Sequence, residues 1–336
     1  MAEIVRYVNT ASSGGDGTTN ATSGVNAAYA SLNSWEAAEN ADLVTATNTH
    51  TVICEGSAAD GNPVTIDGWI TNATYYITIR TDAAGRHTGI WSPSKYRLSM
   101  NGVTALTVNE AYTRCYGLQI EDYGTAGYHN FINHNLGNFF IFGYGIIRKT
   151  TSDLGVHNAF YAATSGNTAY IFNTLIYDMG RVNYDDSGAG VFQYWYNCTA
   201  QNVTASAGAF HSWGNRGVFK NCIAQDCTNG FAGNINTTDS TNNCSDIVSD
   251  APGANPQTGV VTFTNKAGDD FSLSASDAYA KDLGTDLSAD AIFPFSDDII
   301  GVPRSDTWDI GAFAYITASG GSVIPIFMKH YKGLRI

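Results

Sequence analysis

A short segment that returns at regular intervals constrains the fold of this chain more than any other feature. Asn173-Thr174-Leu175-Ile176, Asn197-Cys198-Thr199-Ala200 and Asn221-Cys222-Ile223-Ala224 recur at 24-residue intervals, and Asn243-Cys244 follows 22 residues later. Upstream, Gly117-Leu118-Gln119-Ile120 has the same form. A period of about 20 to 30 residues that returns similar side chains to one position indicates a stacked solenoid. Common helical repeats run to about 33 residues or more. We therefore predict a coil of short parallel strands, with successive turns about 4.8 Å apart.

The repeats also predict which side chains face the interior. Ile171, Trp195 and Phe219 each precede a repeated asparagine by two positions, and we expect them to point inward. The asparagines would then lie at a bend, where stacked amides can hydrogen-bond along the coil axis. The next positions would form a tight interior layer of small side chains, namely Thr174, Cys198, Cys222 and Cys244.

One rung leaves the register open. Between residues 138 and 149, either Gly143 or Gly145 fits the asparagine position, and the second choice places Arg148 inside. The period therefore predicts a rung here without fixing which side chains face the core.

Composition supports a single all-β domain. The chain has 336 residues, of which 35 are glycines and only 14% are charged, as expected for short strands joined by tight turns. Residues 31–41 predict a short helix with Asn33 or Ser34 as its N-cap and Trp35 as a plug for the open end of the solenoid. We expect one β-helix domain over 1–318, with closing strands over 251–318, and a glycine-hinged arm over 319–336.

The two ends of the sequence resemble a known group of proteins. The opening residues Tyr7-Val8-Asn9 and the closing motifs Asp298-Ile299-Ile300-Gly301 and Trp308-Asp309-Ile310-Gly311 are similar to those of right-handed parallel β-helix proteins of the pectate-lyase-like superfamily. The resemblance covers nearly the whole chain and implies a right-handed parallel β-helix. It does not select a function, because the superfamily includes polysaccharide lyases, glycoside hydrolases and virion proteins of phages.

Charge and hydropathy exclude some classes of function. A net charge of −13 without a basic stripe argues against nucleic-acid binding. No segment is apolar for long enough to span a bilayer, and we expect no signal peptide before the first strand. We expect synthesis in a cytoplasm, with free buried cysteines, and a site of action in a virion or outside the cell.

A pair of carboxylates is the first catalytic set to seek in a β-helix, because glycosidases act through two of them. The candidates are Asp178, Asp185, Asp186 and His211. In a lyase the three aspartates would instead bind Ca²⁺, and nearby Arg181 would serve as the base. A solvated acidic turn explains the same residues. His129 and His134 are better explained as parts of a polar loop than as metal ligands. We predict no cofactor and no metal.

Aromatic side chains on two adjacent rungs predict a surface feature. If Trp195 points inward, then Tyr170, Phe172, Tyr194 and Tyr196 point outward. Such a row could lie against sugar rings, pack on a neighbouring subunit, or be covered by a long loop of the same chain.

The last residues combine apolar and basic side chains in a chain that is otherwise acidic. They follow a Gly-Gly hinge and predict an arm that docks on a partner through Ile324, Ile326, Phe327, Lys329, Tyr331, Lys332 and Arg335.

These observations favour a non-enzymatic structural or receptor-facing component of a phage-like virion. Its partners would be other virion proteins or further copies of itself, with a trimer as the expected oligomer. The alternative is an extracellular polysaccharide lyase, glycoside hydrolase or carbohydrate-binding protein that uses one face of the β-helix.

Overall fold

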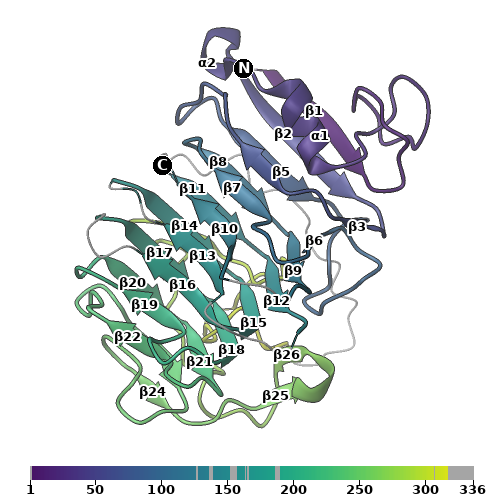
Figure 1. Ribbon diagram of the computed structural model, residues 1–336. Coiled ribbons are helices and arrows are strands. Elements are labelled where there is room, and N and C mark those ends of the chain that lie inside the picture. The colour runs from purple at the N-terminus through teal and green to yellow at the C-terminus, as the bar shows by residue number, and fades with distance from the viewer. Residues whose placement is uncertain are drawn as a thin grey trace.

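The computed structural model describes residues 2–125, 128–135, 139–151, 157–162, 164, 166–185, 190–305 and 307–316. The chain winds as a coil of short strands from its N-terminus at one end to β24 (Gln257–Thr258) at the other (Figure 1). The arm predicted for residues 319–336 lies outside the described residues.

Within these residues the coil has three long sheets of parallel strands and one short parallel pair. An eight-stranded sheet consists of β1 (Ala2–Asn9), β2 (Asn48–Glu55), β5 (Ile77–Thr81), β8 (Thr113–Tyr116), β11 (Phe140–Gly143), β14 (Thr168–Phe172), β17 (Phe192–Tyr196) and β20 (Gly217–Lys220). A nine-stranded sheet consists of β3 (Ala59–Asp60), β6 (Arg97–Met100), β9 (Gln119–Asp122), β12 (Ile146–Lys149), β15 (Leu175–Met179), β18 (Thr199–Val203), β21 (Ile223–Gln225), β23 (Cys244–Ser245) and β24 (Gln257–Thr258). A five-stranded sheet consists of β4 (Val64–Ile66), β7 (Leu106–Val108), β10 (Asn130–His134), β13 (Asn158–Ala162) and β16 (Arg181–Asp185).

Each turn of the coil visits the eight-, nine- and five-stranded sheets in that order, which defines a parallel β-helix. Beyond β16, the short pair β19 (Phe210–Ser212) and β22 (Phe231–Gly233) continues the five-stranded side, since Val182 of β16 donates its N–H to the carbonyl of Ala209. The antiparallel pair β25 (Phe263–Asn265) and β26 (Asp270–Leu273) follows the last coil.

The predicted interior register is confirmed in the strands of the eight-stranded sheet. Ile171, Trp195 and Phe219 are register partners on β14, β17 and β20, and all three are buried in the main core. Phe142 and Cys115 continue this column on the preceding rungs. All six cysteines are buried and free, and Cys198 stacks beside Cys222 as predicted.

The bend after this sheet requires a left-handed backbone, which explains the recurrent asparagine. The bend position has φ between 43° and 75° in Gly117, Tyr144, Asn173, Asn197, Asn221 and Asn242. Glycine and asparagine adopt this conformation more easily than other residues. This settles the register of the rung between residues 138 and 149. Tyr144, not Gly143 or Gly145, takes the asparagine position of that rung. Arg148 accordingly pairs with Glu121 outside the core.

The last repeat is displaced by one residue from the prediction. Cys244 pairs with Ile223 rather than Cys222, so Asn242 occupies the bend and Asn243 faces Cys222. There the Asn243 side chain accepts from the Cys222 N–H at 3.0 Å and donates to the Phe219 carbonyl at 2.8 Å. The Cys244 thiol therefore does not extend the stack of Cys198 and Cys222.

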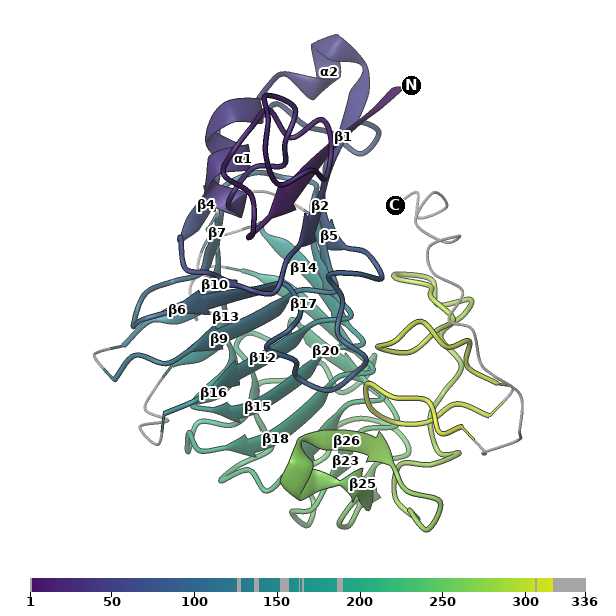
Figure 2. The same cartoon turned by 90° about the vertical axis from the view of Figure 1, so that its right-hand side faces the viewer.

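The side chains of the bend asparagines form hydrogen bonds with the C-terminal part of the chain. Residues 283–305 and 307–316, which we call the strap, run back along the outside of the eight-stranded sheet with few regular bridges (Figure 2). Asn173 donates to the Asp297 carbonyl at 2.9 Å, Asn197 to the Gly311 carbonyl at 3.1 Å, and Asn242 to the Leu283 carbonyl at 2.7 Å. The closing strands predicted over 251–318 are thus limited to β24, β25 and β26.

The strap also covers the outward aromatic row. Tyr170, Phe172 and Tyr196 do point outward, yet they are buried in a second core, together with Leu287, Phe293 and Phe295 of the strap, and Tyr194 is partly buried against it. Tyr170 stacks on Phe293 with ring centroids 5.3 Å apart. Of the three alternatives for this row, the loop of the same chain is the one observed, so an exposed stripe at these four residues is excluded.

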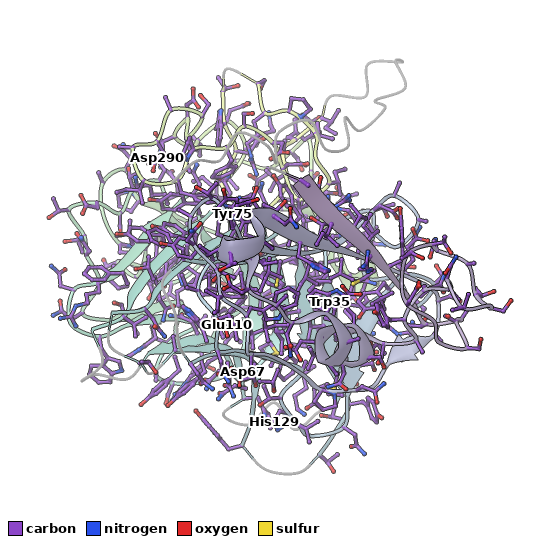
Figure 3. All side chains as sticks on the ribbon, turned by 90° about the horizontal axis from the view of Figure 1, so that it is seen from above. Trp35, Asp67, Tyr75, Glu110, His129 and Asp290 are labelled. Carbon is purple, nitrogen blue, oxygen red and sulfur yellow. The ribbon has the colours of Figure 1, made fainter. Side chains whose placement is uncertain are left out.

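The N-terminal end of the coil is covered by α1 (Leu32–Glu39), which precedes the short helix α2 (Leu43–Ala46). The N-cap is Ser31 rather than Asn33 or Ser34, because its side chain accepts from the Ser34 N–H. Trp35 is fully buried and stacks on Trp69, with ring centroids 5.5 Å apart, as expected for the plug. Figure 3, viewed from above, shows Trp35 on this helix over the coil.

Candidate functional site

A pocket of about 630 Å³ opens on the outer surface of the five-stranded side. We call it the aromatic pocket, and it is lined by residues of β10, β13, β16 and β19 and by the chain beside them, namely Tyr128, Asn130, Tyr161, Arg181, Tyr184, Ala207, His211 and Trp213. It lies on another side of the coil from the strap. Figure 3 shows this separation through His129, the neighbour of Tyr128, and Asp290 of the strap.

Strand register builds the floor of this pocket. Tyr161 and Tyr184 are partners on β13 and β16, and their rings are parallel within 2° at 5.8 Å between centroids. The ring of His211 on β19 continues the stack at 6.3 Å from Tyr184. Because the rings face one another along the coil axis, we infer that their edges and hydroxyl groups face the pocket.

Two further aromatic residues leave ring surface open to solvent. Tyr128 is 52% exposed and Trp213 is 40% exposed, whereas most aromatic side chains of the chain are buried. The Tyr128 hydroxyl accepts from the Asn158 side chain at 2.7 Å, and the Trp213 ring meets His211 edge-on at 4.8 Å. Both rings are therefore held by their neighbours while part of each remains available to a ligand.

The polar groups of the pocket are neutral or cationic. The Arg181 guanidinium lies over the Tyr184 ring at 5.1 Å, and no carboxylate in the described part of the chain pairs with it. Asn130 is held by Asn133 and Asn158, each at 2.7 Å. The described lining includes no Asp or Glu side chain. This lining offers hydrogen-bonding groups and aromatic ring surface to a ligand.

A buried ionic network supports the pocket from inside. His129, between Tyr128 and Asn130, points to Asp122 at 2.7 Å, and Lys149 contacts the same carboxylate at 3.1 Å. Burial alone would raise the pKa of Asp122, but hydrogen bonds from His129, from two backbone N–H groups and from Lys149 outweigh it and lower that pKa. His129 is therefore a buried partner of Asp122.

Of the predicted catalytic residues, only Asp178 and His211 have described side chains, and they lie on different sides of the coil, on β15 and β19. Asp178 has a left-handed backbone at the end of β15, and its carboxylate accepts from the Asn202 side chain at 2.6 Å, so it fits the structural explanation of an acidic turn. Only His211 of the four candidates lines the aromatic pocket, beside Arg181. Asp186 and the side chain of Asp185 lie outside the described residues.

The described residues also limit two other classes of site. They contain no group of three His, Cys, Asp or Glu side chains placed to hold a metal ion. Among them there is also no helix of the length and hydropathy that would cross a membrane.

The strands define the class of this chain: a parallel β-helix protein with an aromatic pocket on one face. The predicted parallel β-helix is confirmed by the long sheets of parallel strands. No protein-family model matches the sequence, and no curated protein matches it either. Among solved structures, the crystal structure of pectate lyase Pel9A is similar, with a TM-score of 0.44 and 13% identity over 94% of this chain and 97% of that one.

Sequence analysis missed four aromatic residues of the pocket, namely Tyr128, Tyr161, Tyr184 and Trp213. Tyr161 and Tyr184 are 23 residues apart, close to the repeat period, which is a detectable signal. The repeated asparagines mark only the bend after the eight-stranded sheet, so they give no signal for the five-stranded side.

Proposed function

We propose that this protein is a non-catalytic glycan-binding β-helix protein whose ligand occupies the aromatic pocket. The observation that carries the proposal is the pairing of two exposed rings, Tyr128 and Trp213, with a pocket lined by amide, imidazole and guanidinium groups. Sugar rings combine apolar C–H faces with hydroxyl groups, so they match aromatic surface bordered by hydrogen-bonding side chains.

The test is a binding screen with four purified polysaccharides: a β-1,4-glucan, a xylan, a polygalacturonate and an alginate. We expect at least one to bind, and we expect the double variant Tyr128→Ala/Trp213→Ala to lose at least tenfold in affinity. Tyr279→Ala is the matched control, because Tyr279 is also 40% exposed but lies outside the pocket. Equal binding by the double variant and the wild type would refute the proposal.

The same screen separates binding from catalysis. Release of shorter saccharides from a bound polymer would overturn the non-catalytic part of the proposal. Asp185→Asn and Asp186→Asn variants would then show whether the predicted carboxylates carry the reaction. A glycan-binding β-helix also suits a receptor-facing virion component, and that placement stays a prediction whose test is the mass of the native particle.

A further inference from the structure

A second pocket lies beside the aromatic pocket on the same side of the coil. It measures about 620 Å³ and is lined by parts of β22 and of the two loops next to it, namely Asn215, residues 231–235, Thr237 and residues 249–252. We call it the end pocket. β22 is the direct neighbour of β19, which supplies His211 to the aromatic pocket.

The boundary between the two pockets is narrow. Ala232 of the end pocket is the register partner of His211, so it occupies the next place in the column of Tyr161, Tyr184 and His211. Because alanine has no ring, the stack stops there and leaves open space. Gly208, next to Ala207 of the aromatic pocket, approaches so closely that an added Cβ would lie 2.5 Å from the Ala232 side chain.

Trp213 stands at this boundary. It follows β19 directly, and two residues later the Asn215 N–H donates to the Asn234 carbonyl at 2.8 Å. The Asn234 N–H in turn donates to the Ser212 carbonyl at 2.7 Å. These bonds join the loops that carry Trp213 and the end pocket, so one ligand can pass over the exposed indole from one pocket to the other.

The chemistry of the end pocket differs from that of the aromatic pocket. The side chains of Asn215, Asn234 and Thr237 are exposed and make no hydrogen bond within the described part of the chain. The Asp250 carboxylate is already used, since it accepts from the Phe231 N–H at 3.1 Å and from the Ser245 hydroxyl at 2.6 Å. The free groups are therefore neutral amides and a hydroxyl, which suit the hydroxyl groups of an uncharged sugar unit.

We infer that the two pockets form one track, and that the ligand is a linear glycan several units long with an uncharged sugar in the end pocket. This inference rests on the proposed glycan binding. The strands that carry Tyr161 and Ala232 are three strand spacings apart along the coil axis, which is about 14 Å. A short saccharide fills one pocket, whereas a longer chain fills both and gains affinity because its second contact is intramolecular.

The experiment uses oligosaccharides of two to eight units prepared from whichever of the four screened polysaccharides binds the full chain. We expect affinity to rise with length and then level off. The double variant Asn234→Ala/Thr237→Ala should bind the longest oligosaccharides about fivefold to tenfold more weakly, and the shortest ones as the wild type does. Trp213→Ala should weaken binding at every length.

The outcomes distinguish the two proposals. Affinity that does not depend on length, or full affinity of the Asn234/Thr237 variant for long chains, would overturn the track while leaving glycan binding intact. Failure of every polysaccharide to bind the wild type would overturn both. The two substitutions are at exposed positions, and their thermal unfolding, measured alongside, confirms that any change in affinity is not a loss of fold.

Discussion

The side chain of Asn221 donates to the side-chain oxygen of Asn197 at 3.1 Å, one rung away along the coil. The axial ladder predicted from the sequence is therefore present between these two residues. Both asparagines also bind the strap: Asn197 through the carbonyls of Asp309 and Gly311, and Asn221 through the backbone of Thr285. The repeated residue thus has two roles, a left-handed bend and an anchor for the strap.

Asn197→Ala should destabilise the protein through both roles. It removes the side-chain hydrogen bonds to the Asp309 and Gly311 carbonyls and to the Asn221 amide, and it forces alanine into a left-handed backbone with φ of 51°. We expect a loss of about 3 kcal/mol or more in denaturant unfolding. Asn202→Ala is the control, because Asn202 has the same backbone conformation but is exposed, and it should cost only about 1 kcal/mol. Equal losses would show that the strap bonds contribute nothing.

Arg304→Met should loosen the strap without unfolding the coil. The Arg304 guanidinium donates to the Gly311 carbonyl at 3.0 Å, to the Asp297 carbonyl at 3.1 Å and to the side chain of Asn173 at 3.2 Å. We expect limited proteolysis to cleave the strap much faster in this variant, while circular dichroism of the β-structure stays nearly unchanged. Lys281→Met, which removes an exposed ion pair, should be cleaved like the wild type.

Lys149→Met should be strongly destabilising at neutral pH. The substitution removes the buried cation paired with Asp122, which costs about 3 to 5 kcal/mol when one partner of a buried ion pair is lost. Because the pKa of Asp122 is lowered in the folded protein, its stabilisation is present above about pH 4 and is lost as the pH falls below that value. The difference between variant and wild type, measured by denaturant unfolding, should therefore shrink in strong acid. Lys266→Met, at an exposed pair with Asp226, should cost less than about 1 kcal/mol.

His50 should make the N-terminal end sensitive to mild acid. Burial lowers the pKa of His50 from 6.5 to about 4, a shift that the nearby Glu39 only partly opposes. Between these values the unfolded chain takes up a proton and the folded chain does not, so stability falls as the pH drops from about 6.5 to 4, by roughly 3 kcal/mol. His50→Gln retains a side-chain acceptor for the Trp35 indole N–H and should flatten this part of the pH profile. If the pH profile of stability were the same in this variant as in the wild type, the acid sensitivity could not be assigned to His50.

The parallel β-helix and its interior column could be predicted because the constraint is local and repeated. A left-handed bend favours asparagine on every rung, so Asn173, Asn197 and Asn221 mark the register directly. The prediction failed where that signal is missing: Tyr144 takes the same backbone with a bulky side chain, and a coil of 21 residues moves Asn242 into the bend.

The covering of the aromatic row and the position of the candidate site could not be predicted in the same way. Whether Tyr170 and Tyr196 are exposed depends on Phe293 and Phe295, about 100 residues later, and no local pattern reports that contact. The aromatic pocket likewise depends on cross-strand pairing of Tyr161 with Tyr184, in strands without the asparagine signal. His211 and Arg181 were selected from sequence for their chemistry, and the structure shows that they share a pocket with rings that were not selected.

The strap changes how the solenoid loses its structure. In an ordinary array of rungs each unit contacts only its neighbours, so the ends can fray one coil at a time. Here the strap bonds to Arg86 near the start of the coil, to Tyr144 and Asn173 in its middle and to Asn242 near its end. Detaching a terminal rung therefore also breaks contacts that brace rungs far from it, which makes unfolding more cooperative than a nearest-neighbour array allows. Because the strap follows the coil in sequence, this bracing forms only after all the rungs have been synthesised, and the growing chain must hold its stack without it.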